Sequence, residues 1–219
     1  MTPDDYRSRY TPDDAVGWQA IDAALGTLYG ERKPLHFAPP LHYIAGGNDP
    51  LDGISVYLSK ADGVHHHFVT YGFSELYYND AAAGGEFSRY GFELTFRLKK
   101  ESDNDELTWA CNLLQNLARY VFETGKWFEN YDVIKTQGPI CRARDTALEA
   151  LAFIEDPELG SIATPHGSVQ FIQLVGLTLD EYSKYEAAPE PLTVSELLSD
   201  LRTASPLLVT DLTRTGTVV

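Results

Sequence analysis

The chain has 219 residues, with 17 Lys and Arg against 32 Asp and Glu, so its formal net charge is −15. This length suits one large domain or two small ones, and 43% apolar with 12% aromatic residues is typical of a folded protein. Direct nucleic-acid binding is not expected, because phosphate recognition needs clustered Lys and Arg. Acidity favours solubility in general, and more specifically it suits a basic partner.

Cysteine use and targeting signals point to the cytoplasm. The two cysteines, Cys111 and Cys141, form no Cys-x-x-Cys pair and are too few for a disulfide framework. The first residues lack the basic start and apolar run of a signal peptide. No stretch approaches the ~18 consecutive apolar residues of a membrane span. We therefore expect a cytoplasmic protein that does not contact a membrane.

Three segments carry the signature of a helix start, a threonine followed by acidic residues. Thr11–Asp14 adds a proline at the first helical position, and the apolar residues that follow at helical spacing predict a helix ending at Gly30. Thr178–Glu181 and Thr193–Glu196 are both predicted capping boxes. A hydrophobic staple is predicted around the last of these, formed by Leu192 and Leu197.

The longest helix is predicted from about Asp105 to Thr124, with Gly125 as its C-terminal breaker. Its apolar residues fall on one face of a 3.6-residue period. These are Leu107, Ala110, Cys111, Leu114, Leu117, Ala118, Val121 and Phe122. Cys111 lies inside this stripe, which predicts a buried, unreactive thiol.

Strands are predicted where apolar and polar residues alternate, over residues 54–58, 92–98 and 169–175, with weaker patterns at 64–71 and 131–136. Such alternation predicts a sheet with one packed face and one more polar face, and the long helix is expected to cover the packed one. The fold class is therefore α/β or α+β, a mixed β-sheet against a long helix with additional flanking helices.

One domain over residues 1–219 is the expected organisation. The single linker-like stretch, Ala187–Pro191, is too short to separate two domains. No internal repeat or low-complexity segment is present.

Motifs for common chemistry are missing from the sequence. It holds no phosphate-binding loop, dinucleotide fingerprint, His-Glu-x-x-His motif, EF-hand loop or Gly-x-Ser-x-Gly elbow. Acidic pairs such as Asp103 with Asp105, and the run Glu155–Glu158, are predicted in exposed loops, where nothing raises a carboxyl pKa for acid–base work. We predict no catalytic residue and no cofactor.

The run His65–His67 is the one cluster that suggests a metal. On a strand His65 and His67 share a face, and a zinc site there needs a further ligand from His36, His42 or Asp62. The alternative is a set of polar, partly buried strand histidines. We favour that alternative and predict no metal site.

Five stretches occur together in the order and spacing of one known family. They are Gly46–Asp52, Tyr71–Tyr77, Tyr90–Lys99, Leu114–Phe122 and Thr164–Phe171. The run Gly-Phe-Glu-Leu-Thr-Phe-Arg-Leu at 91–98 is the most specific of them. On these residues the chain, from about Trp18 to Asp211, resembles the Suppressor of fused family.

The resemblance implies a SUFU-like fold and a non-enzymatic protein-binding role. Animal members are two-domain cytoplasmic regulators of Hedgehog signalling that hold a short peptide of a zinc-finger transcription factor between their domains. This chain is similar only to their N-terminal domain. Short single-domain relatives are typical of bacteria, where the family is thought to include immunity proteins that neutralise toxins.

The resemblance allows two positions of this chain to be matched to peptide-contacting residues of animal members. Tyr77 matches a tyrosine that contacts the peptide in animal members. An aspartate before the Gly-Phe-Glu-Leu run contributes there too, but an ungapped match places Gly85 at its position and Glu86 one residue away.

The residues around these positions are compatible with a partner surface. Tyr77 and Tyr78 lie beside Glu75 and Glu86, and residues 81–85 form an Ala-Gly stretch that predicts a mobile loop. Exposed tyrosines are good interface anchors because they offer rigid area with a polar tip. Phe73 and Leu76 of the same cluster are predicted to be core residues. We predict a partner-binding site at Glu75, Tyr77, Tyr78 and Glu86.

Three functions remain open. The leading hypothesis is an immunity protein that binds a basic toxin domain. The alternative is a peptide-binding regulator or adaptor in which an edge strand pairs with an extended segment. The third is an enzyme whose residues are scattered along the sequence.

Overall fold

The strands build one mixed sheet, and helices cover both of its faces. In this computed structural model residues 1–187 and 191–216 are described. The helices are α1 (Pro3–Arg9), α2 (Val16–Tyr29), α3 (Thr108–Thr124), α4 (Leu179–Ala187) and α5 (Pro191–Ala204), with the short 3-10 helices η1 (Tyr43–Ala45) and η2 (Asp80–Ala82). The strands are β1 (Leu35–Phe37), β2 (Gly53–Ser59), β3 (His65–Tyr71), β4 (Phe87–Lys99), β5 (Val133–Lys135), β6 (Leu148–Glu155), β7 (Ser161–Thr164) and β8 (Gly167–Thr178).

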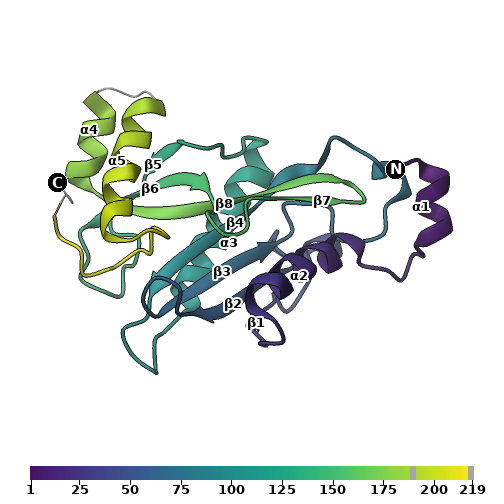
Figure 1. Cartoon of the computed structure of the whole chain (residues 1–219), viewed down its shortest axis with the longest axis horizontal. Helices are drawn as coiled ribbons and strands as arrows, with labels where there is room; N and C mark the ends of the chain where they lie inside the picture. The colour runs from purple at the N-terminus through teal and green to yellow at the C-terminus, as the bar shows by residue number, and fades with distance from the viewer. Residues whose placement is uncertain (188–190, 217–219) are drawn as a thin grey trace.

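The sheet runs β1-β2-β3-β4-β8-β6-β5, and β7 pairs with one end of β8. All neighbours are antiparallel except β4 and β8, which are parallel. This one parallel pair is possible because a long connection containing α3 separates the two strands in sequence. Figure 1 shows α1 at one end of the molecule and the α4–α5 pair at the other. The expected α+β class, with a mixed sheet and flanking helices, is confirmed.

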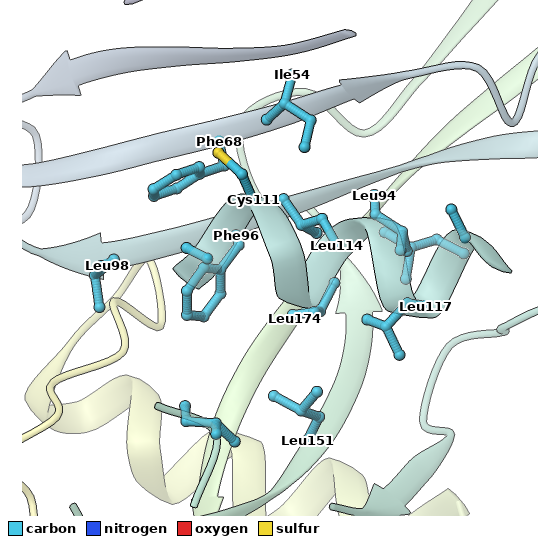
Figure 2. Packing of buried hydrophobic residues seen from close by; sticks show 14 of the residues in the cluster. Ile54, Phe68, Leu94, Phe96, Leu98, Cys111, Leu114, Leu117, Leu151 and Leu174 are labelled. Atoms are coloured by element: carbon cyan, nitrogen blue, oxygen red, sulfur yellow. The ribbon is translucent and has the colours of Figure 1, made fainter. Parts of the chain in front are cut away.

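Helix α3 packs on one face of the sheet, as predicted. Its buried residues Cys111, Leu114 and Leu117 face strand residues that include Phe96 and Leu174 (Figure 2). These residues belong to the largest apolar cluster among the described residues. Burial raises the pKa of the Cys111 thiol to about 12, which fits the predicted unreactive cysteine.

The opposite face is more polar, as expected, but it is also buried. Helix α2 covers part of it through Ile21 and Leu25, and α5 covers another part through Val194 and Leu198. On β4 the apolar residues point toward α3, whereas Glu93, Thr95 and Arg97 point to the second face and are fully buried. The polar half of the alternation is therefore an interior layer and not a solvent-exposed surface.

Several predicted boundaries are confirmed. Gly30 and Gly125 are the C-caps of α2 and α3, both at positive φ. The capping box before α4 is present: the Thr178 amide donates to Glu181 at 2.8 Å, and the Glu181 amide donates to Thr178 Oγ1 at 3.3 Å. The weaker strand patterns correspond to β3 and β5.

The predicted helix start at Thr11–Asp14 is wrong. The Asp14 carboxylate accepts hydrogen bonds from the Thr11 amide and hydroxyl at 2.7 and 2.9 Å, which closes a turn, and α2 begins later, at Val16. The same four residue types at Thr2–Asp5 do form a capping box, with Pro at the start of α1. The identical motif therefore has two outcomes in one chain.

Other differences concern the C-terminal half. Thr193 lies inside α5, which begins at Pro191, so the predicted capping box at Thr193–Glu196 is wrong. Residues 188–190 of the linker-like stretch lie outside the described residues, as does the Leu192 side chain of the predicted staple. Strands β1, β6 and β7 were not predicted. None of the helices in the described ranges combines the length and apolar character needed to cross a bilayer.

Candidate functional site

The four predicted site residues lie in the connection from β3 to β4, at the end of the molecule near α1. The start of this connection is anchored by Glu93 of β4. Its fully buried carboxylate accepts hydrogen bonds from the backbone amides of Gly72 and Ser74 and from the hydroxyls of Ser74 and Thr70. Phe73, whose ring centre lies 4.6 Å from that of Phe92, is a core residue as predicted.

Helix α2 closes over the next residues. The Leu76 carbonyl accepts hydrogen bonds from the amides of Gly17 and Trp18, so it satisfies the free N–H groups at the start of α2. The Leu76 side chain is buried, as predicted. A Cβ on Gly17 would lie 1.9 Å from the Glu75 carbonyl oxygen, so only glycine allows this close approach.

Glu75 is half-buried and faces the start of β4. Its amide donates to Ser88 Oγ at 3.0 Å, and its carboxylate accepts a hydrogen bond from the Asn79 side-chain amide at 2.9 Å. Glu86 is exposed, and its carbonyl accepts a hydrogen bond from the Ser168 amide. The fold thus brings Glu75 close to the segment that contains Glu86.

Tyr78 packs against the N-terminal helix. Its ring lies 5.1 Å from that of Tyr6, whose hydroxyl is hydrogen-bonded to His166 Nε2 at 2.8 Å. Arg7 of α1 pairs with Asp80, the first residue of η2. The Ala-Gly stretch, predicted to be mobile, is held here by η2 and by a hydrogen bond from the Gly84 amide to the Pro165 carbonyl.

Tyr77 points elsewhere. Its side chain is 37% exposed, and burial of the rest together with the neighbouring Asp52 carboxylate raises its pKa to about 12. Tyr77 and Tyr78 therefore have different neighbours, the loop before β2 for one and α1 for the other. The four predicted residues lie on one connection without forming one continuous patch.

A bulge in β4 opens a cleft next to this connection. Phe87 pairs with Ser168 and Phe92 with Gln170, so five steps along β4 match only two along β8. Gly91 takes a φ of +79° within this bulge, and a Cβ there would lie 3.2 Å from the Phe87 side chain. The extra residues bend β4 away from β8.

This aromatic cleft has a volume of about 580 Å³. It is lined by Phe87, Arg89–Phe92, Trp127–Asn130, Gln170 and Ile172. Phe87 on β4 is 61% exposed, and Trp127, after α3, is 56% exposed. Phe128 is buried and stacks on Phe153 at 4.2 Å, which makes the floor rigid. Two large aromatic side chains thus stand exposed on walls of the same cleft.

Sequence reasoning missed Phe87 and Trp127. The signal that was available is that Phe87 follows Glu86 directly and that Trp127 follows the helix breaker Gly125. Their meeting depends on the bulge in β4, which local alternation does not show.

The histidine run lies on β3, and His65 and His67 share a face as predicted. Both are fully buried. His67 Nδ1 is 2.6 Å from the Tyr29 hydroxyl, and its Nε2 is 3.1 Å from Asp156. Within residues 1–187 and 191–216 no group of three or more His, Cys, Asp or Glu is placed to hold a metal ion.

Asp156, predicted to lie in an exposed loop, is instead fully buried and is the centre of this polar cluster. It accepts hydrogen bonds from Thr95 at 2.8 Å and from Arg97 at 3.0 and 3.1 Å. Because a carboxylate only accepts, the hydrogen of neutral His67 sits on Nε2, and Nδ1 accepts from Tyr29. Every polar atom of His67 is thus engaged in an internal bond, and the cluster joins the strands to α2.

The pKa values of His67 and Asp156 are shifted by their burial and by their hydrogen-bonded and charged neighbours. Burial lowers the pKa of His67 to about 4, although the hydrogen bond to Asp156 acts in the opposite direction. Burial also disfavours the charged form of Asp156, but the hydrogen bond from His67 and the charge of Arg97 outweigh it and hold the Asp156 pKa well below its usual range.

The fold is an α+β domain built on one mixed sheet, and comparisons identify its family. The sequence pattern of the Suppressor of fused protein (SUFU) family matches residues 47–215. The Suppressor of fused homologs of Mus musculus and Homo sapiens are each 32% identical to this chain over 216 residues, which is 92% of this chain and 44% of the relative. The chain belongs to the Suppressor of fused family, and it spans less than half the length of these curated relatives.

Solved structures agree with this assignment. A chain of the Sufu–Fu complex matches with a TM-score of 0.83 and 34% identity, covering 93% of both chains. Drosophila Suppressor of Fused matches with a TM-score of 0.82 and 32% identity, covering 95% of this chain and 52% of the other. A putative SUFU homolog from Neisseria gonorrhoeae, at 15% identity and a TM-score of 0.62, shares the fold; the match covers 93% of this chain and 97% of the other. Binding and regulation of other proteins, without catalysis, is the role of this family.

Proposed function

We propose that this chain is a non-enzymatic protein-binding module that holds a segment of a partner protein in the aromatic cleft. The observation that carries the proposal is the exposure of Phe87 and Trp127 on walls of one preformed cleft. Large exposed aromatic side chains over a rigid floor are the usual anchors of protein interfaces.

The connection from β3 to β4 supports the same proposal. Glu75 and Glu86 lie near the β4 end of the cleft, because the Glu75 amide donates to Ser88 and Glu86 precedes Phe87. In this proposal Tyr77 and Tyr78 extend the contact surface beyond the cleft, and the two carboxylates select a partner with basic residues beside its apolar anchor. No cofactor or metal takes part.

The partner is one of two kinds. A basic toxin domain suits the net charge of −15, which accelerates association with a positive surface, and the chain is then a cytoplasmic immunity protein acting as one domain. An extended peptide suits the shape of the cleft, and the chain is then a regulator or adaptor like animal Suppressor of fused. The matching chain of the Sufu–Fu complex comes from an assembly of two proteins, which supports protein binding in either case.

A selection experiment tests the proposal. A display library of random peptides, and separately any toxin encoded beside the gene, are offered to the full chain and to the Phe87→Ala/Trp127→Ala variant. Leu35→Ala, an equally exposed residue on β1 at the far edge of the sheet, is the control. We expect binding to the wild type and to the control and its loss in the cleft variant. Unchanged binding of the peptide or toxin to the cleft variant would contradict the proposal.

Protection in cells separates the two partners. Co-expression with the neighbouring toxin restores growth if the chain is an immunity protein. No rescue, together with capture of a peptide class in the selection, favours the regulator.

A further inference from the structure

A second groove lies between α3 and the edge strand β5 and shares Phe128 with the lining of the aromatic cleft. We call it the α3–β5 groove. Its volume is about 880 Å³. One wall is formed by α3 side chains that include Trp109, Leu113 and Tyr120, and the other by residues 134–140 with Arg142.

The strand along this groove has an unpaired edge. β5 is the last strand of the sheet and pairs only with β6 among the described strands. The Asp132 carbonyl accepts a hydrogen bond from the Phe153 amide, and the Thr136 amide donates to the Glu149 carbonyl. Because backbone groups of an antiparallel strand alternate in direction, those of Val133 and Lys135 point away from β6. They form a template for one more strand.

The lining of the α3–β5 groove differs in charge from the whole protein. In the described part of the chain no Asp or Glu lines the α3–β5 groove, although the sequence has 32 of them. Arg142 lines the groove itself. The Lys135 ammonium lies on the opposite face of β5, 5.6 Å from the centre of the Tyr182 ring on α4. A strand added to β5 presents side chains to both faces and therefore passes between these two cations.

We propose that the α3–β5 groove binds an extended, acidic segment of a partner protein, which adds to β5 as a further strand. Its apolar side chains enter the groove against α3, and its carboxylates face Arg142 and Lys135. The exposed amides of Asn112 and Gln137 lie at the groove for additional hydrogen bonds. This surface is separate from the aromatic cleft and selects a segment of the opposite charge from the one proposed there.

The probe is the same random peptide library, displayed against the full chain. Peptides that bind the groove are expected to be acidic, with apolar residues at alternate positions. Their affinity for the Lys135→Glu/Arg142→Glu variant should fall by about tenfold or more, since two attractions become repulsions. The control Arg32→Glu/Lys60→Glu makes the same change in charge at exposed residues outside the groove and should bind normally.

Backbone pairing is measured directly on the wild-type complex. Amide hydrogen exchange should slow at Val133 and Lys135 when a selected acidic peptide binds, and exchange in β1 should not change. The proposal is overturned if no acidic peptide is enriched, if the charge-reversed variant binds such peptides normally, or if these two amides stay unprotected. Concentration-dependent protection without peptide would assign the edge to a second copy of the chain and also overturn it. Peptides that bind the wild type and the charge-reversed variant, but not Phe87→Ala/Trp127→Ala, occupy the aromatic cleft and not the α3–β5 groove.

Discussion

Arg97 and Asp156 form a fully buried ion pair that joins β4 to the end of β6. Two hydrogen bonds of 3.0 and 3.1 Å run from one guanidinium nitrogen to the two carboxylate oxygens. The remaining donors of Arg97 reach Gln173 at 3.0 Å, Glu158 at 2.8 Å and His65 Nε2 at 3.2 Å. Both charges are thus compensated inside the protein, and removal of Asp156 leaves the buried Arg97 with the partly exposed Glu158 as its remaining acidic partner.

Asp156→Asn should therefore lower the free energy of unfolding by about 3 kcal/mol, because Arg97 loses its fully buried counter-ion and keeps only the partly exposed Glu158. Urea unfolding followed by circular dichroism measures it. Asp211→Asn is the matched control, since Asp211 pairs with the half-exposed Lys99, and its cost should stay below about 1 kcal/mol. Equal losses of unfolding free energy in the two variants would show that burial does not determine how strongly an ion pair stabilises this protein.

The free energy of unfolding should decrease when the pH falls below the usual pKa of a histidine side chain. His67 has a folded pKa of about 4 against an unfolded value of 6.5, so the unfolded chain binds the proton first, and stability is lost from about pH 6.5 down to 4. The lowered pKa of Asp156 continues this loss below its unfolded pKa of 3.8.

The variant His67→Gln separates the effect of His67 on the pH dependence of stability from that of Glu93. The raised pKa of Glu93 changes stability with pH in the opposite direction. Measured between pH 4 and 6.5, the slope of unfolding free energy against pH should be smaller in the variant by about one proton. An unchanged slope would mean that His67 is not the group that titrates.

Two glycines in α2 should respond in opposite ways to alanine. Gly17→Ala places a Cβ 1.9 Å from the Glu75 carbonyl oxygen and should destabilise the protein by several kcal/mol, roughly 3 or more, because α2 must move off the connection. Gly26 has no atom within 4 Å of its virtual Cβ, so Gly26→Ala should stabilise by about 0.5–1 kcal/mol. Melting temperatures of the two variants measure both effects. Similar shifts for the two would contradict the close approach at Gly17.

Tyr77→Ala should weaken binding of the partner by more than about 1 kcal/mol, because a rigid, partly exposed tyrosine is removed from the contact surface. Isothermal titration against the selected partner gives the affinity. Leu35→Ala again serves as the control. An affinity equal to that of the wild type would place the contact surface away from Tyr77.

Local sequence patterns predicted the elements that local forces determine. The apolar stripe of α3 and the capping box at Thr178 act within one helix, and both were predicted. β6 was missed because Leu148–Glu155 is rich in residues that favour helices, and its burial on both faces becomes visible only in the sheet.

The remaining errors involve contacts between distant segments. The motif at Thr11 lost its capping role because the Leu76 carbonyl, far away in sequence, satisfies the start of α2. The alternating pattern of β4 predicts that Glu93 and Arg97 face solvent. They are buried because their hydrogen-bond partners Ser74 and Asp156 come from other segments of the chain. The aromatic cleft likewise depends on a bulge that pairing with β8 creates.

The affinity of the selected partner for Phe87→Ala/Trp127→Ala, relative to the wild type, tests the proposed binding role most directly. Both side chains are largely exposed, so the variant should keep its melting temperature while its affinity falls by about 30-fold or more, as expected for loss of a hot spot worth about 2 kcal/mol. Affinity within about twofold of the wild type, in a variant that melts normally, would contradict a partner site at the aromatic cleft.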